Sequence, residues 1–256
     1  MTNEIDTYVH NVVRLHTPNV AYILEDKINE LRPHIHTWAN GHQYEIKLSG
    51  SLAKGTGISG TTDIDIFVSL HPSVGEYNSL ENVYNTLRNR FVGAGYSARE
   101  QNVSVGLDHA GLKVDVVAGV KHHVLGFDHS IWKRKAETWT KTNVDAHITY
   151  VKNSGRVFDI KLVKIWRKLS DLDFPSFYLE LSVIEALKGT TLLGFSPSVN
   201  FIKVMNYLAT DFVDKKIFDP ANLSNEVSDE LSKTEKEVIR DAAVSTLQKS
   251  WTEAVW

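Results

Sequence analysis

LSGS at residues 48–51 and DIDIFV at residues 63–68 are the two stretches that decide the fold of this chain of 256 residues. Before the first stretch, apolar and polar residues alternate over residues 44–48, a pattern typical of a strand. The second stretch alternates in the same way and predicts another strand. Eleven residues rich in Gly and Thr separate Ser51 from Asp63. The sequence therefore predicts a strand, a glycine-rich turn and a second strand in succession.

Three aspartates lie in or beside apolar strands. In the second strand Ile64 and Ile66 would enter the core, so Asp63 and Asp65 would project together from the other face. Two adjacent carboxylates repel each other unless a cation lies between them, and oxygen ligands suit Mg²⁺. Asp115 is a lone acid inside another predicted strand. Three carboxylates on neighbouring strands could hold two metal ions roughly 4 Å apart, the arrangement used in phosphoryl transfer.

The turn at Gly50 and Ser51 supplies the small residues that a phosphate site requires. Without bulky side chains, backbone N–H groups and one hydroxyl can approach a triphosphate. A pair of aspartates spaced by one residue is weak evidence by itself, because most such pairs are solvated loop acids or turn caps. A glycine-rich turn is also weak evidence by itself. Their combination with Asp115 favours a metal site that binds a nucleotide.

The periodicity of the remaining sequence predicts an α+β fold. The expected helices lie at residues 4–14, 19–31, 79–92, 156–169, 176–188, 197–209 and 232–249, and further strands at 103–107 and 112–117. We expect a sheet lobe at residues 1–140, in which helices that include the N-terminal ones flank a mixed or antiparallel sheet. A helical lobe would follow at residues 141–256.

Composition excludes several classes of protein. The chain has no Cys, which excludes disulfides, thiol catalysis and thiolate metal sites and fits a reducing compartment. Its 28 Lys and Arg residues against 31 Asp and Glu residues give a net charge of −3, so we expect no stable binding to duplex nucleic acid. No apolar run approaches the roughly 18 residues of a membrane span, and the acidic start MTNEIDTY is unlike a signal peptide. We expect a cytoplasmic protein without a membrane partner.

The arrangement from Gly50 to Asp65, with Asp115 downstream, resembles the polymerase-β-like nucleotidyltransferase superfamily. Within it, the sequence most resembles the branch of oligoadenylate synthetases, archaeal-type CCA-adding enzymes and bacterial cGAS/DncV-like nucleotidyltransferases (CD-NTases). Downstream segments also resemble this branch, and they lie at residues 143–151, 158–166, 174–181 and 218–222. The resemblance covers about residues 40–230.

The resemblance implies a nucleotidyltransferase fold followed by a helical lobe that clamps the nucleotide, with the active-site cleft between the two lobes. It implies that Asp63, Asp65 and Asp115 are catalytic and hold two Mg²⁺ ions, with Mn²⁺ as an alternative. The residues that it implies for nucleotide binding are Gly50, Ser51, Lys161, Lys164, Ser176 and Tyr178.

The last four of these residues also have structural interpretations. Lys161 and Lys164 are three residues apart on one side of a helix, where most lysines are simply solvated. Ser176 follows a proline and could be a helix N-cap, which is compatible with a phosphate contact because helix N-termini attract anions. Tyr178 could belong to the core.

The resemblance implies a Mg²⁺-dependent, template-independent nucleotidyltransferase (EC 2.7.7 class) that releases pyrophosphate. The expected substrates are nucleoside triphosphates, ATP favoured, and the expected product is a cyclic or linear oligonucleotide second messenger. This product would act on a separate effector protein in bacterial antiviral defence. Beyond the two expected lobes, the chain lacks the length for the additional tRNA-holding domains of archaeal-type CCA-adding enzymes, and it lacks their excess of basic residues. Alternatives are transfer to an RNA 3′ end or to a small molecule such as an aminoglycoside, and a non-catalytic nucleotide-binding regulator.

Overall fold

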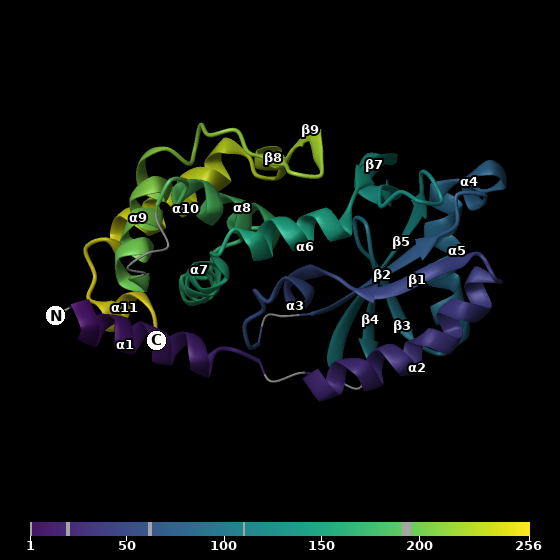
Figure 1. Ribbon diagram of the computed structural model, residues 1–256, viewed down its shortest axis with the longest axis horizontal. Helices are drawn as coiled ribbons and strands as arrows, with labels where there is room; N and C mark the ends of the chain where they lie inside the picture. Colours follow the sequence, from purple (N-terminus) through teal and green to yellow (C-terminus); the bar gives the residue numbers. More distant parts are fainter. Residues whose placement is uncertain (1, 19–20, 61–62, 110, 191–195) are drawn as a thin grey trace. The chain divides into compact units, whose positions relative to one another are not determined.

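The computed structural model describes residues 2–18, 21–60, 63–109, 111–190 and 196–256, and the chain forms two compact units (Figure 1). The sheet unit comprises Asn19–Ala53 and Thr62–Ile148. The helical unit comprises Met1–Pro18, Lys54–Thr61 and Thr149–Trp256. The N-terminal helix and residues 54–60 therefore pack with the helical unit, although they were expected in the first lobe.

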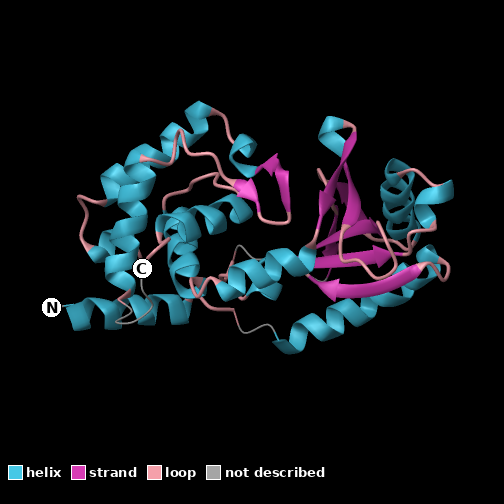
Figure 2. Cartoon of the chain, turned by 45° about the horizontal axis from the view of Figure 1, so that its top comes forward, coloured by secondary structure: helices cyan, strands magenta, loops and turns pink. Residues whose placement is uncertain are grey.

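The sheet unit is built on a mixed sheet of seven strands in the order β1-β2-β5-β4-β3, with β6 paired to β5 and β7 to β6 (Figure 2). Only β2 and β5 pair in parallel among the pairings described, and the others are antiparallel. The elements are α2 (Ala21–Ala39), β1 (Gln43–Leu48), α3 (Gly50–Lys54), β2 (Ile64–Leu70), α4 (Val74–Tyr77), α5 (Leu80–Gly93), β3 (Ser97–Glu100), β4 (Val105–His109), β5 (Leu112–Lys121), β6 (His129–Lys133), β7 (Thr138–Thr142) and the start of α6 (Val144–Asn153).

One face of this sheet is covered by α2 and α5. Alternate residues of β2, such as Ile64 and Ile66, pack in a buried apolar cluster with Leu31 and Ile35 of α2. Leu87 of α5 belongs to the same cluster. Side chains of β2 at the intervening positions project from the opposite face, because side chains alternate along a strand.

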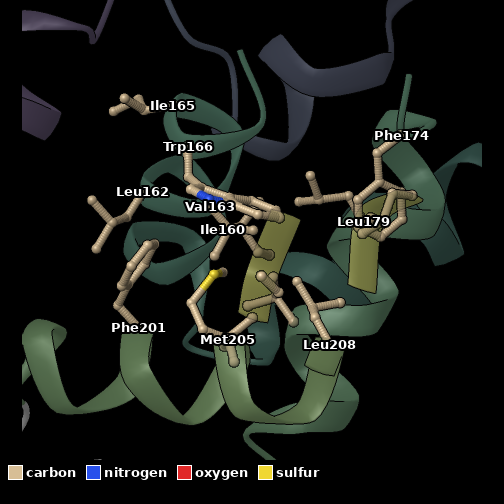
Figure 3. Close-up of a cluster of buried hydrophobic side chains, with 14 of the residues drawn as sticks. Ile160, Leu162, Val163, Ile165, Trp166, Phe174, Leu179, Phe201, Met205 and Leu208 are labelled. Atoms are coloured by element: carbon tan, nitrogen blue, oxygen red, sulfur yellow. The ribbon is translucent and has the colours of Figure 1, made fainter. Parts of the chain in front are cut away.

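The helical unit is held together by a second apolar core. Its elements are α1 (Thr2–Leu15), the end of α6, α7 (Val157–Leu169), α8 (Ser176–Ala186), α9 (Pro197–Thr210), β8 (Phe218–Asp219), β9 (Asn222–Glu226), α10 (Lys233–Thr246) and α11 (Trp251–Ala254). Trp166 of α7 is fully buried in this core, to which Phe201 and Met205 of α9 also belong (Figure 3). Val9 and Val12 of α1 are buried in it too, which explains why the first helix belongs to this unit.

The structure confirms the predicted fold class: a mixed sheet flanked by helices and a helical part. The helix expected at 19–31 continues through Pro33 to Ala39. Four helices that the structure describes, α3, α4, α6 and α11, were not predicted, and neither were the five strands β3 and β6–β9. In the described part of the chain, no helix combines the length and apolar character needed to cross a membrane.

Candidate active site

Asp65 and Asp115 lie directly opposite each other on the parallel strands β2 and β5. Residues paired in register on neighbouring strands point to the same face of a sheet. Ile64 and Val114, the pair just before them, are buried in the core on the other face. Asp63 immediately precedes β2 and is near enough for its charge to act on Asp115. The structure therefore places Asp65 and Asp115 side by side, with Asp63 close enough to act electrostatically on Asp115.

The electrostatics of this site show carboxylates that repel one another. Burial raises the pKa of Asp115 to about 6, with further contributions from the charges of Asp65 and Asp63, against the opposing hydrogen bond from Gln101. Burial also raises the pKa of Asp63, although the positive charges of Lys113 and Arg99 oppose the shift. A divalent cation would relieve this repulsion, because it stabilises the ionised form of every carboxylate near it.

Gly50 packs against the carboxylate of Asp65. Its φ is +59°, and a Cβ atom placed on it would lie 1.8 Å from Asp65 Oδ2. Only glycine adopts this left-handed backbone conformation without strain and also lacks the Cβ atom that would clash with Asp65. The backbone N–H of Ser49 donates to the Asp65 carbonyl at 2.8 Å, which fixes the start of the turn on β2. Ser51 follows in the first turn of α3, partly exposed, so the predicted phosphate-binding turn adjoins the carboxylates.

The donor atoms of this site suit Mg²⁺, which prefers carboxylate oxygens and keeps several waters. Among the residues that the structure describes, no three His, Asp or Glu side chains already converge as a metal-binding group. Asp65 Oδ2 faces Gly50, and Asp115 Oδ1 accepts a hydrogen bond from Gln101 Nε2 at 2.8 Å. The chemistry of the donors thus fits the ion, and the number of ions stays a prediction.

Lys164 is part of a buried ionic cluster in the helical unit. Its Nζ donates to Glu180 Oε1 at 2.6 Å and to Thr56 Oγ1 at 3.2 Å. Lys54 Nζ donates to the other oxygen of Glu180 at 2.6 Å, and Thr56 Oγ1 donates to Glu180 Oε1 at 2.6 Å. Lys164 is 2% exposed and Glu180 is 0% exposed. We therefore assign Lys164 to this cluster instead of to the predicted phosphate contacts.

Burial and charge act in opposite directions on Glu180. Burial alone would raise the pKa of this carboxyl group, but the charges and hydrogen bonds of Lys164 and Lys54 outweigh it and lower the pKa to about 2. For Lys164, burial is the largest influence and lowers the pKa of the ammonium group, although Glu180 opposes the shift. Glu180 thus remains ionised at neutral pH and holds the two lysines in place.

Tyr178 lies in the core of the helical unit. Its ring packs edge-on against Phe174 and stacks on Phe212, with ring centroids 5.4 and 5.2 Å away. Its side chain is 0% exposed, and within the described residues its hydroxyl has no hydrogen-bond partner. Burial raises the pKa of this hydroxyl. The placement favours the core interpretation of Tyr178 over the predicted triphosphate contact.

Lys161 and Ser176 are more accessible than Lys164 and Tyr178. Lys161 is partly exposed, its Nζ donates to Thr17 Oγ1 at 3.3 Å, and no described carboxylate pairs with it. Ser176 is exposed at the first position of α8, where its Oγ accepts a hydrogen bond from Arg167 at 3.0 Å. Arg167, three residues after Lys164 on α7, was missed by the sequence analysis, although this helical spacing was a usable signal.

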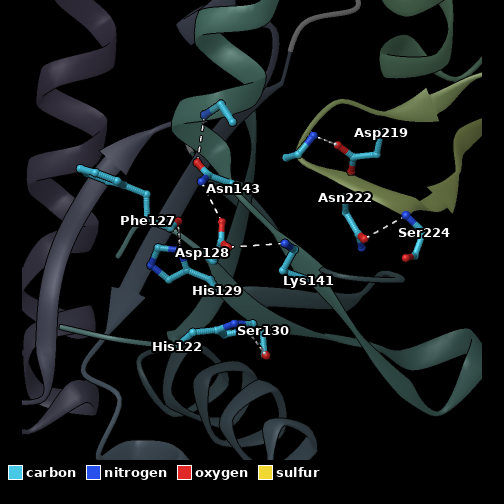
Figure 4. Close-up of polar contacts among 12 residues, drawn as sticks. His122, Phe127, Asp128, His129, Ser130, Lys141, Asn143, Asp219, Asn222 and Ser224 are labelled. Carbon is cyan, nitrogen blue, oxygen red and sulfur yellow. Dashed lines mark hydrogen bonds and ion pairs between the residues drawn. The ribbon is translucent and has the colours of Figure 1, made fainter. Parts of the chain in front are cut away.

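Two further segments that carry the family resemblance make local structural contacts. Asn143 Oδ1 accepts from the backbone N–H of Ala146 at the start of α6, and Asn143 Nδ2 donates to Asp128 at 2.9 Å (Figure 4). In the helical unit, Asp219 Oδ1 accepts from the backbone N–H of Ala221 at 2.8 Å across the turn that contains Pro220. Both segments therefore stabilise turns and a helix start.

Comparison with known proteins gives a result for structure only: no protein-family model and no curated protein matches the sequence. The structure is similar to E. coli MS115-1 CdnC with ATP (TM-score 0.70, 22% identity, covering 90% of this chain and 86% of that chain). It is also similar to the Elizabethkingia meningoseptica CdnE cyclic dinucleotide synthase with GTP and Apcpp (0.68, 10%, 88% and 92%). The structure is similar as well to the Cid1 poly(U) polymerase bound to MgATP, with a TM-score of 0.70 and 14% identity, and the match covers 98% of this chain and 97% of that chain. The chain therefore has the fold of the polymerase-β-like nucleotidyltransferases, including the CD-NTases.

Proposed function

We propose that the protein is a Mg²⁺-dependent nucleotidyltransferase that joins nucleoside triphosphates, without a template, into a cyclic or linear oligonucleotide signal. The observation that carries this proposal is the contact of the Gly50 turn with Asp65, which is paired in register with Asp115. A turn suited to phosphates thus adjoins a set of carboxylates suited to a divalent cation. Action on a separate effector, in bacterial antiviral defence, stays a prediction.

Five residues of the sheet unit have specific roles in this proposal. Asp63, Asp65 and Asp115 would hold Mg²⁺, which supplies charge neutralisation on the triphosphate and lowers the pKa of a bound hydroxyl. Gly50 and Ser51 would bind the phosphates through backbone N–H groups and the serine hydroxyl. Catalysis of this kind depends on positioning and electrostatic stabilisation more than on covalent chemistry by the protein.

The similar structures support nucleoside triphosphates as substrates, because CdnC, CdnE and Cid1 were solved with ATP, GTP or an analogue. CdnE is a cyclic dinucleotide synthase, which supports an oligonucleotide product for this chain. Cid1 is a poly(U) polymerase, and the match covers 98% of this chain and 97% of that one. Addition of nucleotides to an RNA 3′ end is therefore the second candidate function.

Product analysis distinguishes the two functions. The protein is incubated with each NTP and dNTP and Mg²⁺, with and without an RNA primer, and the products are identified by mass spectrometry. Oligonucleotides formed without primer support the signalling function, and extension that requires primer supports the RNA function. Asp115→Asn provides the control for contaminating activity, and an absence of any nucleotide transfer in all reactions would contradict the proposal.

Nucleotide affinity should separate the roles of Lys161 and Asp115. A lysine that contacts the phosphates acts before and during the reaction, so Lys161→Ala should weaken NTP binding by about 1.5–3 kcal/mol, the loss of one charge-assisted hydrogen bond. Asp115→Asn should abolish turnover but largely retain binding. Calorimetric titration with a non-hydrolysable NTP measures both affinities.

Lys203→Ala, which removes an exposed lysine of α9, is the matched control for the lost charge. Its affinity should equal that of the wild type. If Lys161→Ala binds NTP as tightly as this control while Asp115→Asn loses all affinity, the proposed division of roles is wrong.

A further inference from the structure

Gln101 makes two side-chain hydrogen bonds at the candidate active site. Its Nε2 donates to Asp115 Oδ1 at 2.8 Å, and its Oε1 accepts from Ser104 Oγ at 2.9 Å. Because the hydroxyl occupies the oxygen end of the amide, the NH₂ end is directed at the carboxylate. An amide NH₂ group can only donate, so it matches an ionised carboxylate. The contact thus fixes one oxygen of Asp115.

The segment that carries Gln101 is itself held firmly. The backbone N–H of Gln101 donates to the carbonyl of Ser104 at 3.1 Å. The hydroxyl of Tyr84, on α5, lies 3.0 Å from the Gln101 carbonyl and 3.1 Å from the Ser104 carbonyl, and donates to these acceptors. Tyr84 and Ser104 are each 5% exposed. The position of the Gln101 side chain is therefore determined by buried contacts of the sheet unit.

Gly106 provides the space that the Gln101 amide occupies. It lies opposite Asp115 in the antiparallel pairing of β4 with β5. A Cβ atom on Gly106 would lie 2.6 Å from Gln101 Nε2 and 3.2 Å from Asp115 Oδ1. The Gln101 amide thus occupies the space that a side chain at position 106 of β4 would fill. An alanine here would displace the end of a flexible side chain, a smaller disturbance than a clash with backbone.

We infer that Gln101 is a positioning residue for Asp115, and that Gly106 allows it to be one. The amide holds Oδ1 and so orients the carboxylate that would hold the cation. This inference rests on the proposed function. Groups that orient a metal ligand through a hydrogen bond typically change metal affinity or activity by about 10–100-fold when they are removed.

Two variants remove the contact by different means. Gln101→Leu keeps a side chain of similar size without a donor, and Gly106→Ala fills the space of the amide. Each should lower kcat by about 10–100-fold, with KM for NTP within about twofold of wild type, because Asp115 rather than the phosphate site is disturbed. Binding of Mn²⁺ without nucleotide, followed by electron paramagnetic resonance, should weaken by a similar factor.

The double variant gives the sharpest result. If both substitutions act through the same amide, the double variant should be no worse than the more affected single variant, whereas independent defects would add. Gly93→Ala, in the same unit, is the matched control, because no described atom beyond its chain neighbours and its own helix backbone lies within 4 Å of the Cβ position. This control should show wild-type Mn²⁺ affinity and kcat.

The outcomes separate this inference from the proposed function. If wild-type protein transfers no nucleotide, the proposed function fails, and the Mn²⁺ titrations still test the contact. Wild-type Mn²⁺ affinity in both Gln101→Leu and Gly106→Ala would overturn the inference. Additive losses in the double variant, or a fall in thermal stability without a change in Mn²⁺ affinity, would also overturn it.

Discussion

Asp65→Asn is expected to abolish pyrophosphate release while the protein stays folded. Loss of a carboxylate ligand removes charge stabilisation of several kcal/mol, so turnover should fall by at least ~10³-fold. The amide has almost the same shape as the carboxylate, so its fit against Gly50 is retained. Burial raises the pKa of Asp115 and the charge of Asp65 adds to this shift, so removal of that charge relieves repulsion in the metal-free protein. Thermal unfolding and a pyrophosphate assay measure the two effects.

The matched control for this variant is Asp26→Asn, which removes an exposed acidic charge from α2 of the same unit. It should release pyrophosphate at the wild-type rate. Wild-type turnover in folded Asp65→Asn would contradict the assignment of Asp65 to the catalytic site. A melting temperature far below that of the wild type would contradict the expected relief of repulsion.

Glu180→Gln is expected to cause the largest loss of stability among the substitutions considered. Within the described part of the chain, Glu180 is the carboxylate that pairs with both Lys54 and Lys164. Its neutralisation leaves two ammonium groups close together without this counter-charge, and breaking a buried pair in this way costs about 3–5 kcal/mol. Lys164→Met instead leaves Lys54 paired with Glu180 and should cost clearly less. Urea denaturation measures both free energies of unfolding.

The pH dependence provides a second test of this cluster. The folded-state pKa of Glu180, about 2, lies below the ordinary value of 4.5, so its stabilising effect is fully present above pH 4.5. That effect is lost as the pH falls from 4.5 towards 2. The difference in stability between wild type and Glu180→Gln should therefore shrink over this range. A difference that stays constant from pH 6 to pH 3 would contradict the assigned ion pair.

The central strand pair could be predicted from sequence because its pattern is local. Alternation alone places Asp65 opposite to Ile64 and Ile66, and the observed register then places Asp115 beside it. The short helix α3 was missed because its first residues, Gly50 and Ser51, are typical of turns. Strands β6 and β7 lack a clear apolar alternation, and their pairing with each other supplies the missing stabilisation.

The surroundings of the two lysines of α7 were harder to predict because they depend on distant residues. Helical spacing shows that Lys161 and Lys164 share a side of α7, but it cannot show which ammonium group meets a carboxylate. Glu180 lies 16 residues after Lys164, and Lys54 lies 126 residues before Glu180. No local sequence pattern indicated a role for Gln101, because its proposed role depends on the contact with Asp115 and on the space beside Gly106.

Tracing the α-phosphorus of the nucleotide tests the central claim most directly. The protein is incubated with Mg²⁺ and each nucleoside triphosphate, and the reaction is followed by phosphorus NMR. Nucleotidyl transfer predicts one pyrophosphate for every new phosphodiester bond, with the α-phosphorus in that bond, and neither signal in Asp65→Asn. Formation of orthophosphate in place of pyrophosphate, or complete recovery of every NTP and dNTP unchanged, would contradict the claim.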